Sequence, residues 1–266
     1  MQYTLNIKGR LLDLSEPRVM GILNATPDSF FADSRRQTER EIAERADEIV
    51  RQGGSFIDVG AYSTRPGAAE VSVEEEMERL RMALNVVRRV QPDVPLSVDT
   101  FRADVAKMAV EEYGADIVND VSEGADEAML RTVARLGVPY ILMSTQSDLH
   151  DTLMTFARKV QTLRDMGQKD IILDPGFGFG KTLEDNYRLM NEMEKLQVMG
   201  LPILVGISRK SMIYKLLTTN QDNALNGTTA LNTIALLKGA SILRVHDVKE
   251  AMECVKIFKA LNPQQT

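Results

Sequence analysis

Residues 170–182 read DIILDPGFGFGKT, an apolar run that ends in a carboxylate and continues into a loop with little side-chain bulk. Ile171, Ile172 and Leu173 are typical of a short strand buried on both faces of a parallel sheet. The glycines of the loop allow backbone to approach a ligand closely. The stretch therefore predicts a binding site at Asp174. Taken alone, the stretch fits better a glycine-rich turn in which Asp174 caps the next helix.

Two nucleotide-binding motifs do not fit this loop. The Walker pattern GxxxxGK[ST] places a glycine where Pro175 stands. The glycines at 176, 178 and 180 are spaced GxGxG, whereas the dinucleotide fingerprint is GxGxxG. Neither a P-loop nor a dinucleotide site is therefore expected here.

The strand-then-helix pattern of this stretch recurs along the whole chain. Apolar strand-like runs occupy 19–23, 56–59, 94–98, 116–118, 139–143, 171–173, 203–207 and 242–245, and segments of helical spacing occupy 37–52, 73–90, 102–113, 126–136, 149–166, 183–199, 226–238 and 247–260. Eight such units in 266 residues predict an α/β fold of the (β/α)8 TIM barrel type, because an open doubly wound sheet rarely needs so many. Weak alternation within 1–17 predicts an N-terminal β-hairpin. No linker divides the chain, so we expect one domain over 1–266.

Composition excludes several classes of partner. A net charge of −6 gives no overall field that attracts nucleic acid or acidic lipid, so an anion must be bound by a local cluster. A single cysteine, Cys254, excludes an internal disulfide and a zinc motif and fits a reducing compartment. No signal-peptide layout and no apolar run approaching roughly 18 residues are present. We expect a cytoplasmic protein with no nucleic-acid or membrane partner.

Polar residues follow the apolar runs. In chain order they are Asn24, Asp58, Asp99, Asn119 with Asp120, Ser144, Asp174, Ser208 with Arg209 and Lys210, and Arg244 with His246. The carboxyl ends of parallel barrel strands meet at one mouth, so these side chains should converge. Asn, Asp and Ser are ordinary turn formers, but Lys, Arg and His are not. The set predicts a site where carboxylates and amides bind a polar heterocycle and cations bind an anion.

Eight blocks of sequence together resemble the dihydropteroate synthases, the folate-pathway transferases targeted by sulfonamides. The blocks are MGILNATPDSF (20–30), DVGAYSTRPGA (58–68), SVDTFRADVA (97–106), IVND (117–120), ILDPGFGFGKT (172–182), LVGISRKSMI (204–213), GTTAL (227–231) and RVHDVKE (244–250). The resemblance implies condensation of 6-hydroxymethyl-7,8-dihydropterin diphosphate with p-aminobenzoate to 7,8-dihydropteroate and pyrophosphate. It also implies Mg²⁺ as cofactor, a TIM barrel and a homodimer.

The resemblance also implies roles for individual residues. The pterin-binding residues would be Asp99, Asn119, Asp174 and Lys210, and those holding the diphosphate would be Asn24, Arg244 and His246, with Asn24 as the Mg²⁺ ligand. The residues holding p-aminobenzoate and the substrate loops would be Thr64, Arg65, Pro66 and Ser208. Catalysis would depend on Asp99, Lys210, Arg244 and His246. The loops at 26–31 and 63–67 would close over substrate.

The chain departs from the family pattern in three places. The family commonly shows Met-His-Met-Gln-Gly after the fifth strand, whereas this chain reads MSTQS at 143–147. Tyr62 stands where the family has Glu, and Ala25 where it has Val. These departures leave open whether Ser144 contacts a ligand or is a turn residue. Two other functions stay open, a methyltetrahydrofolate-dependent methyltransferase and a non-catalytic pterin-binding paralogue.

Overall fold

The computed structural model describes residues 3–25, 32–62 and 71–262. Parallel strands form an eight-stranded sheet in the order β8-β7-β6-β5-β4-β3-β10-β9. The strands are β3 (Arg18–Asn24), β4 (Phe56–Gly60), β5 (Leu96–Asp99), β6 (Ile117–Asp120), β7 (Tyr140–Met143), β8 (Ile171–Asp174), β9 (Leu204–Val205) and β10 (Ile242–Val245). A bridge between Leu173 and Ile203 brings the two edge strands together. The predicted barrel is confirmed.

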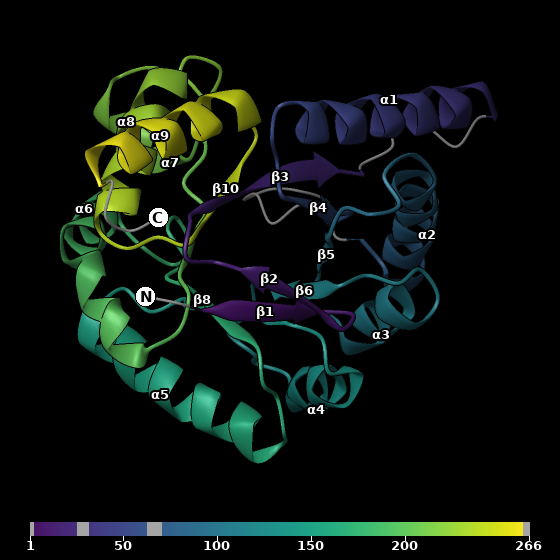
Figure 1. Ribbon diagram of the computed structural model, residues 1–266, viewed down its shortest axis with the longest axis horizontal. Coiled ribbons are helices and arrows are strands. Elements are labelled where there is room, and N and C mark those ends of the chain that lie inside the picture. Colours follow the sequence, from purple (N-terminus) through teal and green to yellow (C-terminus); the bar gives the residue numbers. More distant parts are fainter. Residues whose placement is uncertain (1–2, 26–31, 63–70, 263–266) are drawn as a thin grey trace.

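The helices surround the sheet, as Figure 1 shows. They are α1 (Ala32–Arg51), α2 (Val73–Val90), α3 (Ala103–Glu111), α4 (Glu127–Leu136), α5 (Leu149–Asp165), α6 (Leu183–Glu192), α7 (Ser211–Leu216), α8 (Leu225–Leu237) and α9 (Val248–Leu261), with a 3₁₀ turn η1 (Met193–Met199) after α6. No helix within the described ranges is long and apolar enough to cross a membrane. The boundary of one domain over 1–266 stays a prediction.

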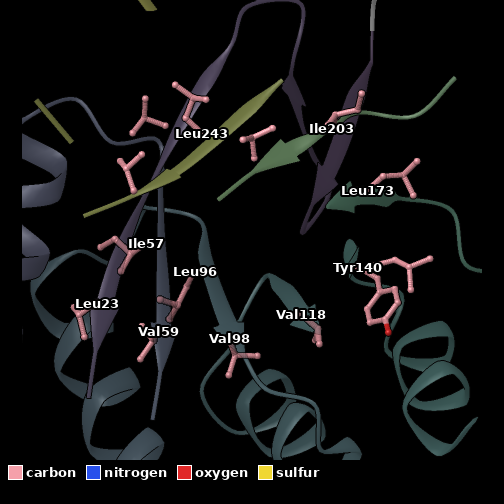
Figure 2. Close-up of a cluster of buried hydrophobic side chains, with 14 of the residues drawn as sticks. Leu23, Ile57, Val59, Leu96, Val98, Val118, Tyr140, Leu173, Ile203 and Leu243 are labelled. Atoms are coloured by element: carbon pink, nitrogen blue, oxygen red, sulfur yellow. The ribbon is translucent and has the colours of Figure 1, made fainter. Parts of the chain in front are cut away.

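Alternate residues of each strand belong to two separate cores. Val19 of β3 and Leu243 of β10 pack outward against the helices, and Figure 2 shows such outer side chains from successive strands. Their neighbours Met20 and Ile242 belong instead to a smaller cluster inside the barrel. The strands are therefore apolar on both faces and are continuous apolar runs in the sequence. Strand β5 is the exception, because the polar Ser97 and Asp99 alternate with its apolar residues.

The N-terminal hairpin closes one end of the barrel. Strands β1 (Thr4–Ile7) and β2 (Arg10–Asp13) pair antiparallel, and the two residues between them, Lys8 and Gly9, have φ of 49° and 83°. Positive φ at both positions is the requirement of a type I′ hairpin turn. Leu5 is fully buried and packs in the inner cluster with residues from the beginnings of the strands. The hairpin does not cover the opposite end, at the carboxyl ends of the strands, where barrels of this type bind ligands.

Several element boundaries differ from those expected. The helix expected at 183–199 ends at Glu192 and continues as η1, and the strand expected at 203–207 is reduced to Leu204–Val205. Helix α7 was not expected, because six residues are too few to show a helical period. Helix α1 begins at Ala32, earlier than the expected 37.

Candidate active site

Arg244 is the centre of the charged cluster at the strand ends. It projects from β10, and its Nε donates to Asp58 Oδ2 of β4 at 2.6 Å. Its terminal nitrogen donates to Asp99 Oδ2 of β5 at 2.5 Å. Asn119 of β6 donates through Nδ2 to the same Asp58 oxygen at 3.1 Å. The predicted convergence of these strand ends is therefore observed across four strands.

Two buried oxygens in this cluster have no partner among the residues that the structure describes. Asp58 Oδ1 and Asn119 Oδ1 lack hydrogen bonds within the described part of the chain, and both side chains are almost fully buried. Buried polar atoms in folded proteins nearly always have a partner. Both oxygens can only accept, so the site is prepared for a ligand that presents hydrogen-bond donors.

Burial raises the pKa of Asp99 to about 7. The guanidinium of Arg244 opposes this rise, while the neighbouring carboxylate of Asp58 adds to it. Arg244 itself stays charged: burial lowers its pKa, but the carboxylates of Asp58 and Asp99 more than compensate. One guanidinium therefore donates hydrogen bonds to two carboxylates, and the pKa of Asp99 lies close to neutral pH.

Asp174, at the end of β8, and Lys210, which follows β9, lie next to this cluster and attract each other electrostatically. Gly176 N donates to Asp174 Oδ1 at 2.8 Å, and Lys210 Nζ donates to Phe177 O. Burial raises the pKa of Asp174, and Lys210 lowers it. Burial also lowers the pKa of Lys210 to about 8, against the attraction of Asp174. Lys210 is therefore mostly protonated at pH 7 and can donate to a ligand.

Asp174 does not cap a helix. The N-cap of α6 is Thr182, whose Oγ1 accepts from Asp185 N at 3.1 Å while the Asp185 side chain accepts from Thr182 N. This is a complete capping box. The alternative interpretation of residues 170–182 as a turn with Asp174 as its cap is wrong.

His246 and Ser208 are hydrogen-bonded to each other. Ser208 Oγ lies 3.0 Å from His246 Nδ1 and accepts from His246 N at 3.1 Å. Because Oγ already accepts the backbone N–H, its own proton can go to Nδ1, which leaves the ring proton on Nε2. Burial, together with the nearby charge of Arg244, lowers the pKa of His246 to about 4. The ring is therefore neutral at pH 7 and offers its Nε2–H as a hydrogen-bond donor.

The comparisons with known proteins agree with this geometry. The family model described as "Pterin binding enzyme" matches residues 20–246. The dihydropteroate synthase of Escherichia coli K12 is 38% identical over 268 residues, covering 95% of this chain and 94% of that protein. The chain belongs to the dihydropteroate synthase family.

Solved structures of dihydropteroate synthases share the fold as well. The enzyme of Xanthomonas albilineans with 4-aminobenzoic acid has a TM-score of 0.90 and 33% identity, covering 98% of each chain. The enzyme of Anaplasma phagocytophilum with bound 6-hydroxymethylpterin-monophosphate has a TM-score of 0.87 and 32% identity, covering 92% of this chain and 99% of that one. The family predicted from the sequence blocks is confirmed.

The structure describes only some of the other residues expected from the dihydropteroate synthase pattern. Asn24 ends β3 and its side chain is exposed. Thr64, Arg65 and Pro66, and the loop at 26–31, lie outside the described residues. Tyr62 packs its ring edge-on to Phe101, with 5.2 Å between ring centroids. The roles assigned to individual side chains stay predictions.

Three side chains at the mouth were not chosen from the sequence. Asp58 was noted at a strand end but given no role, although it accepts a hydrogen bond of 2.6 Å from Arg244 Nε. Lys181 ends the glycine-rich loop, and its Nζ donates to Ser144 O at 3.2 Å, Gly176 O at 3.0 Å and Phe179 O at 3.2 Å. The third side chain is Glu123. No sequence pattern marks it as a site residue, because its hydrogen-bond partners, residues 144–146, belong to the next loop of the barrel.

Proposed function

We propose that this protein condenses 6-hydroxymethyl-7,8-dihydropterin diphosphate with p-aminobenzoate, forming 7,8-dihydropteroate and pyrophosphate. The membership of the dihydropteroate synthase family supports the reaction, as do the relatives that bind 4-aminobenzoic acid and a pterin monophosphate. The observation that carries it is the unpartnered Asn119 Oδ1, buried in the same mouth as Asp174 and Lys210. These groups match the donors and the acceptor on the edge of a pterin ring.

The pterin edge presents an amino group, a ring N–H and a carbonyl. We assign the amino and ring N–H donors to Asp174, and the carbonyl to Lys210. Asn119 and Asp99 bind the rest of the ring. Such a site rejects an analogue that lacks the edge by about 10⁴-fold, because the buried protein groups would be left unpaired.

The diphosphate binds on the side of Arg244 and His246. Arg244 supplies a permanent charge, and His246 supplies a neutral N–H donor, consistent with its lowered pKa. No cluster of three or more His, Cys, Asp or Glu side chains that could hold a metal occurs in the described ranges. An ion held by Asn24, water and the diphosphate is the arrangement that suits Mg²⁺, which keeps several waters. When bound, Mg²⁺ neutralises charge on the diphosphate.

The displacement is dissociative. The C–O bond between the pterin methylene and the diphosphate breaks first, and its electron pair leaves with pyrophosphate. Arg244 and His246 stabilise the charge that develops on the leaving group, while Asp99 offsets the cationic methylene. The amine of p-aminobenzoate then forms the C–N bond and loses a proton to water. Ser208, Thr64, Arg65 and Pro66 hold p-aminobenzoate in line for this attack.

A homodimer is also proposed, as the family resemblance implies. Helices α7, α8 and α9 expose large apolar side chains, namely Leu216, Leu217, Ile234, Leu237, Ile257 and Leu261. Adjacent apolar side chains of this kind on a surface are typical of a protein–protein interface. Analytical ultracentrifugation should show a dimer, and Leu237→Glu should give monomers. A wild-type monomer at micromolar concentration would remove the proposal.

The decisive experiment measures pyrophosphate release with and without p-aminobenzoate. Release that requires both substrates supports the synthase. Methyl transfer from methyltetrahydrofolate without pyrophosphate release would support the methyltransferase alternative. Pterin binding without either reaction would support the non-catalytic paralogue. The family comparisons do not favour these two alternatives.

A further inference from the structure

Glu123 accepts five hydrogen bonds from the loop that follows β7, residues 144–148, the fifth loop of the barrel. Its carboxylate accepts from Ser144 Oγ at 3.1 Å, Thr145 N at 3.0 Å and Thr145 Oγ1 at 3.0 Å. Gln146 Nε2 donates to both of its oxygens, at 3.1 and 3.0 Å. Glu123 lies between β6 and α4 with a φ of 62°, a conformation that non-glycine residues rarely adopt. These contacts lie where the chain departs from the family pattern at 143–147.

The fifth loop in turn packs tightly on the glycine-rich loop after β8. A Cβ atom on Gly176 would lie 1.9 Å from Ser144 O, and one on Gly180 would lie 2.9 Å from Thr145 O. No side chain fits at either position. Lys181 joins the two loops, because its Nζ donates to Ser144 O on one side and to the carbonyls of Gly176 and Phe179 on the other.

The glycine-rich loop contacts both groups that we assign to the pterin edge. Gly176 N orients the Asp174 carboxylate at 2.8 Å, and Ser144 N donates to the backbone oxygen of Asp174, also at 2.8 Å. Phe177 O anchors Lys210. A shift of the fifth loop would therefore move both partners of the pterin.

We propose that Glu123 is a positioning residue for pterin recognition, acting through the fifth loop and Lys181 to fix the backbone that aims Asp174 and Lys210. The inference rests on the proposed function, since it takes Asp174 and Lys210 as the pterin contacts. Glu123 does not touch the reacting atoms in this scheme.

The charge of Glu123 matters as well as its hydrogen bonds. Burial lowers the pKa of Lys181 to about 8, and the carboxylates of Asp174, Glu123 and Asp185 oppose this. Lys181 needs its proton to donate to three carbonyls at once. Removing the charge of Glu123 therefore favours loss of that proton and loosening of both loops.

The test compares Glu123→Gln with Glu127→Gln in steady-state kinetics of the full chain. Glu127 is a matched control, because it is exposed and pairs only locally with Arg131 at 2.9 Å. Glu123→Gln should raise KM for the pterin diphosphate about tenfold, as expected for lost hydrogen bonds to a charged group. The KM for p-aminobenzoate and kcat should stay within about twofold. The alkaline limb of kcat/KM for the pterin substrate should move to lower pH.

A second pair of variants separates positioning from general instability. Thr145→Val removes one hydrogen bond without changing shape and should raise the same KM by about threefold. In a Lys181→Met background, adding Glu123→Gln should cost little more, because both act through the same loops. Equal rises in both KM values, or kinetics like those of Glu127→Gln, would overturn the inference. A wild-type protein that releases no pyrophosphate would overturn the proposed function instead.

Discussion

Asp58 offers the sharpest test of the charged cluster. Its Oδ2 accepts from Arg244 Nε at 2.6 Å and from Asn119 Nδ2 at 3.1 Å, whereas its Oδ1 has no partner among the described residues. In Asp58→Asn the carbonyl oxygen can keep both hydrogen bonds, and the new amide takes the position of Oδ1. Only the charge is lost, which should cost about 1–2 kcal/mol of the free energy of unfolding.

Asp58→Ala is a harsher change at the same place. It removes both hydrogen bonds and leaves Asp99 as the remaining carboxylate on the Arg244 guanidinium within the described ranges. Breaking a buried ion pair costs about 3–5 kcal/mol, and the lower value applies because Asp99 remains. At about 2–4 °C per kcal/mol, Tm should fall by about 2–8 °C for Asn and about 6–12 °C for Ala.

Urea unfolding and thermal melts of both variants measure these differences, with the exposed Asp93→Asn as control. The carboxylate of Asp58 raises the pKa of Asp99, so Asp58→Asn should also move the acidic limb of activity to lower pH. Equal stability of the Ala and Asn variants would refute the ion-pair account. An unchanged acidic limb would refute the electrostatic link between Asp58 and Asp99.

Three further predictions concern the substrate groups. Asp174→Ala should abolish pterin binding in calorimetry because the amino and ring N–H donors lose their acceptor, and a variant that keeps its affinity would remove this assignment. The pKa of His246 is lowered from 6.5 to about 4 in the folded protein. As pH falls from about 6.5 to 4, the unfolded chain binds a proton at this imidazole and the folded protein does not, so stability is lost over this range. That loss, on the order of 2–3 kcal/mol, should be absent in His246→Gln when unfolding is compared at pH 4.5 and 7. Chelation of Mg²⁺ with EDTA should stop pyrophosphate release, and Asn24→Ala should raise the Mg²⁺ concentration needed for half-maximal rate; full activity in EDTA would exclude the metal.

Much of the fold can be predicted from local patterns. Strands buried on both faces are continuous apolar runs, and each is followed by a helix, so the number of units identifies the barrel. Weak alternation of polarity around Lys8 and Gly9 predicts the hairpin that closes the opposite end. The turn after each strand places polar residues at one mouth. The sequence blocks add the family, and the comparisons confirm it.

The partners of each group at that mouth were decided by the tertiary structure alone. Arg244 meets Asp58 and Asp99 across 186 and 145 positions of sequence, and the neutral state of His246 follows from its burial beside Arg244. Glu123, in the loop after β6, accepts a hydrogen bond from Ser144 in the neighbouring loop after β7. The formation of an ion pair and the pKa of a buried group depend on distances in space and on the exclusion of water. A closed barrel brings together residues that are far apart in the chain, and their sequence spacing does not reveal these distances.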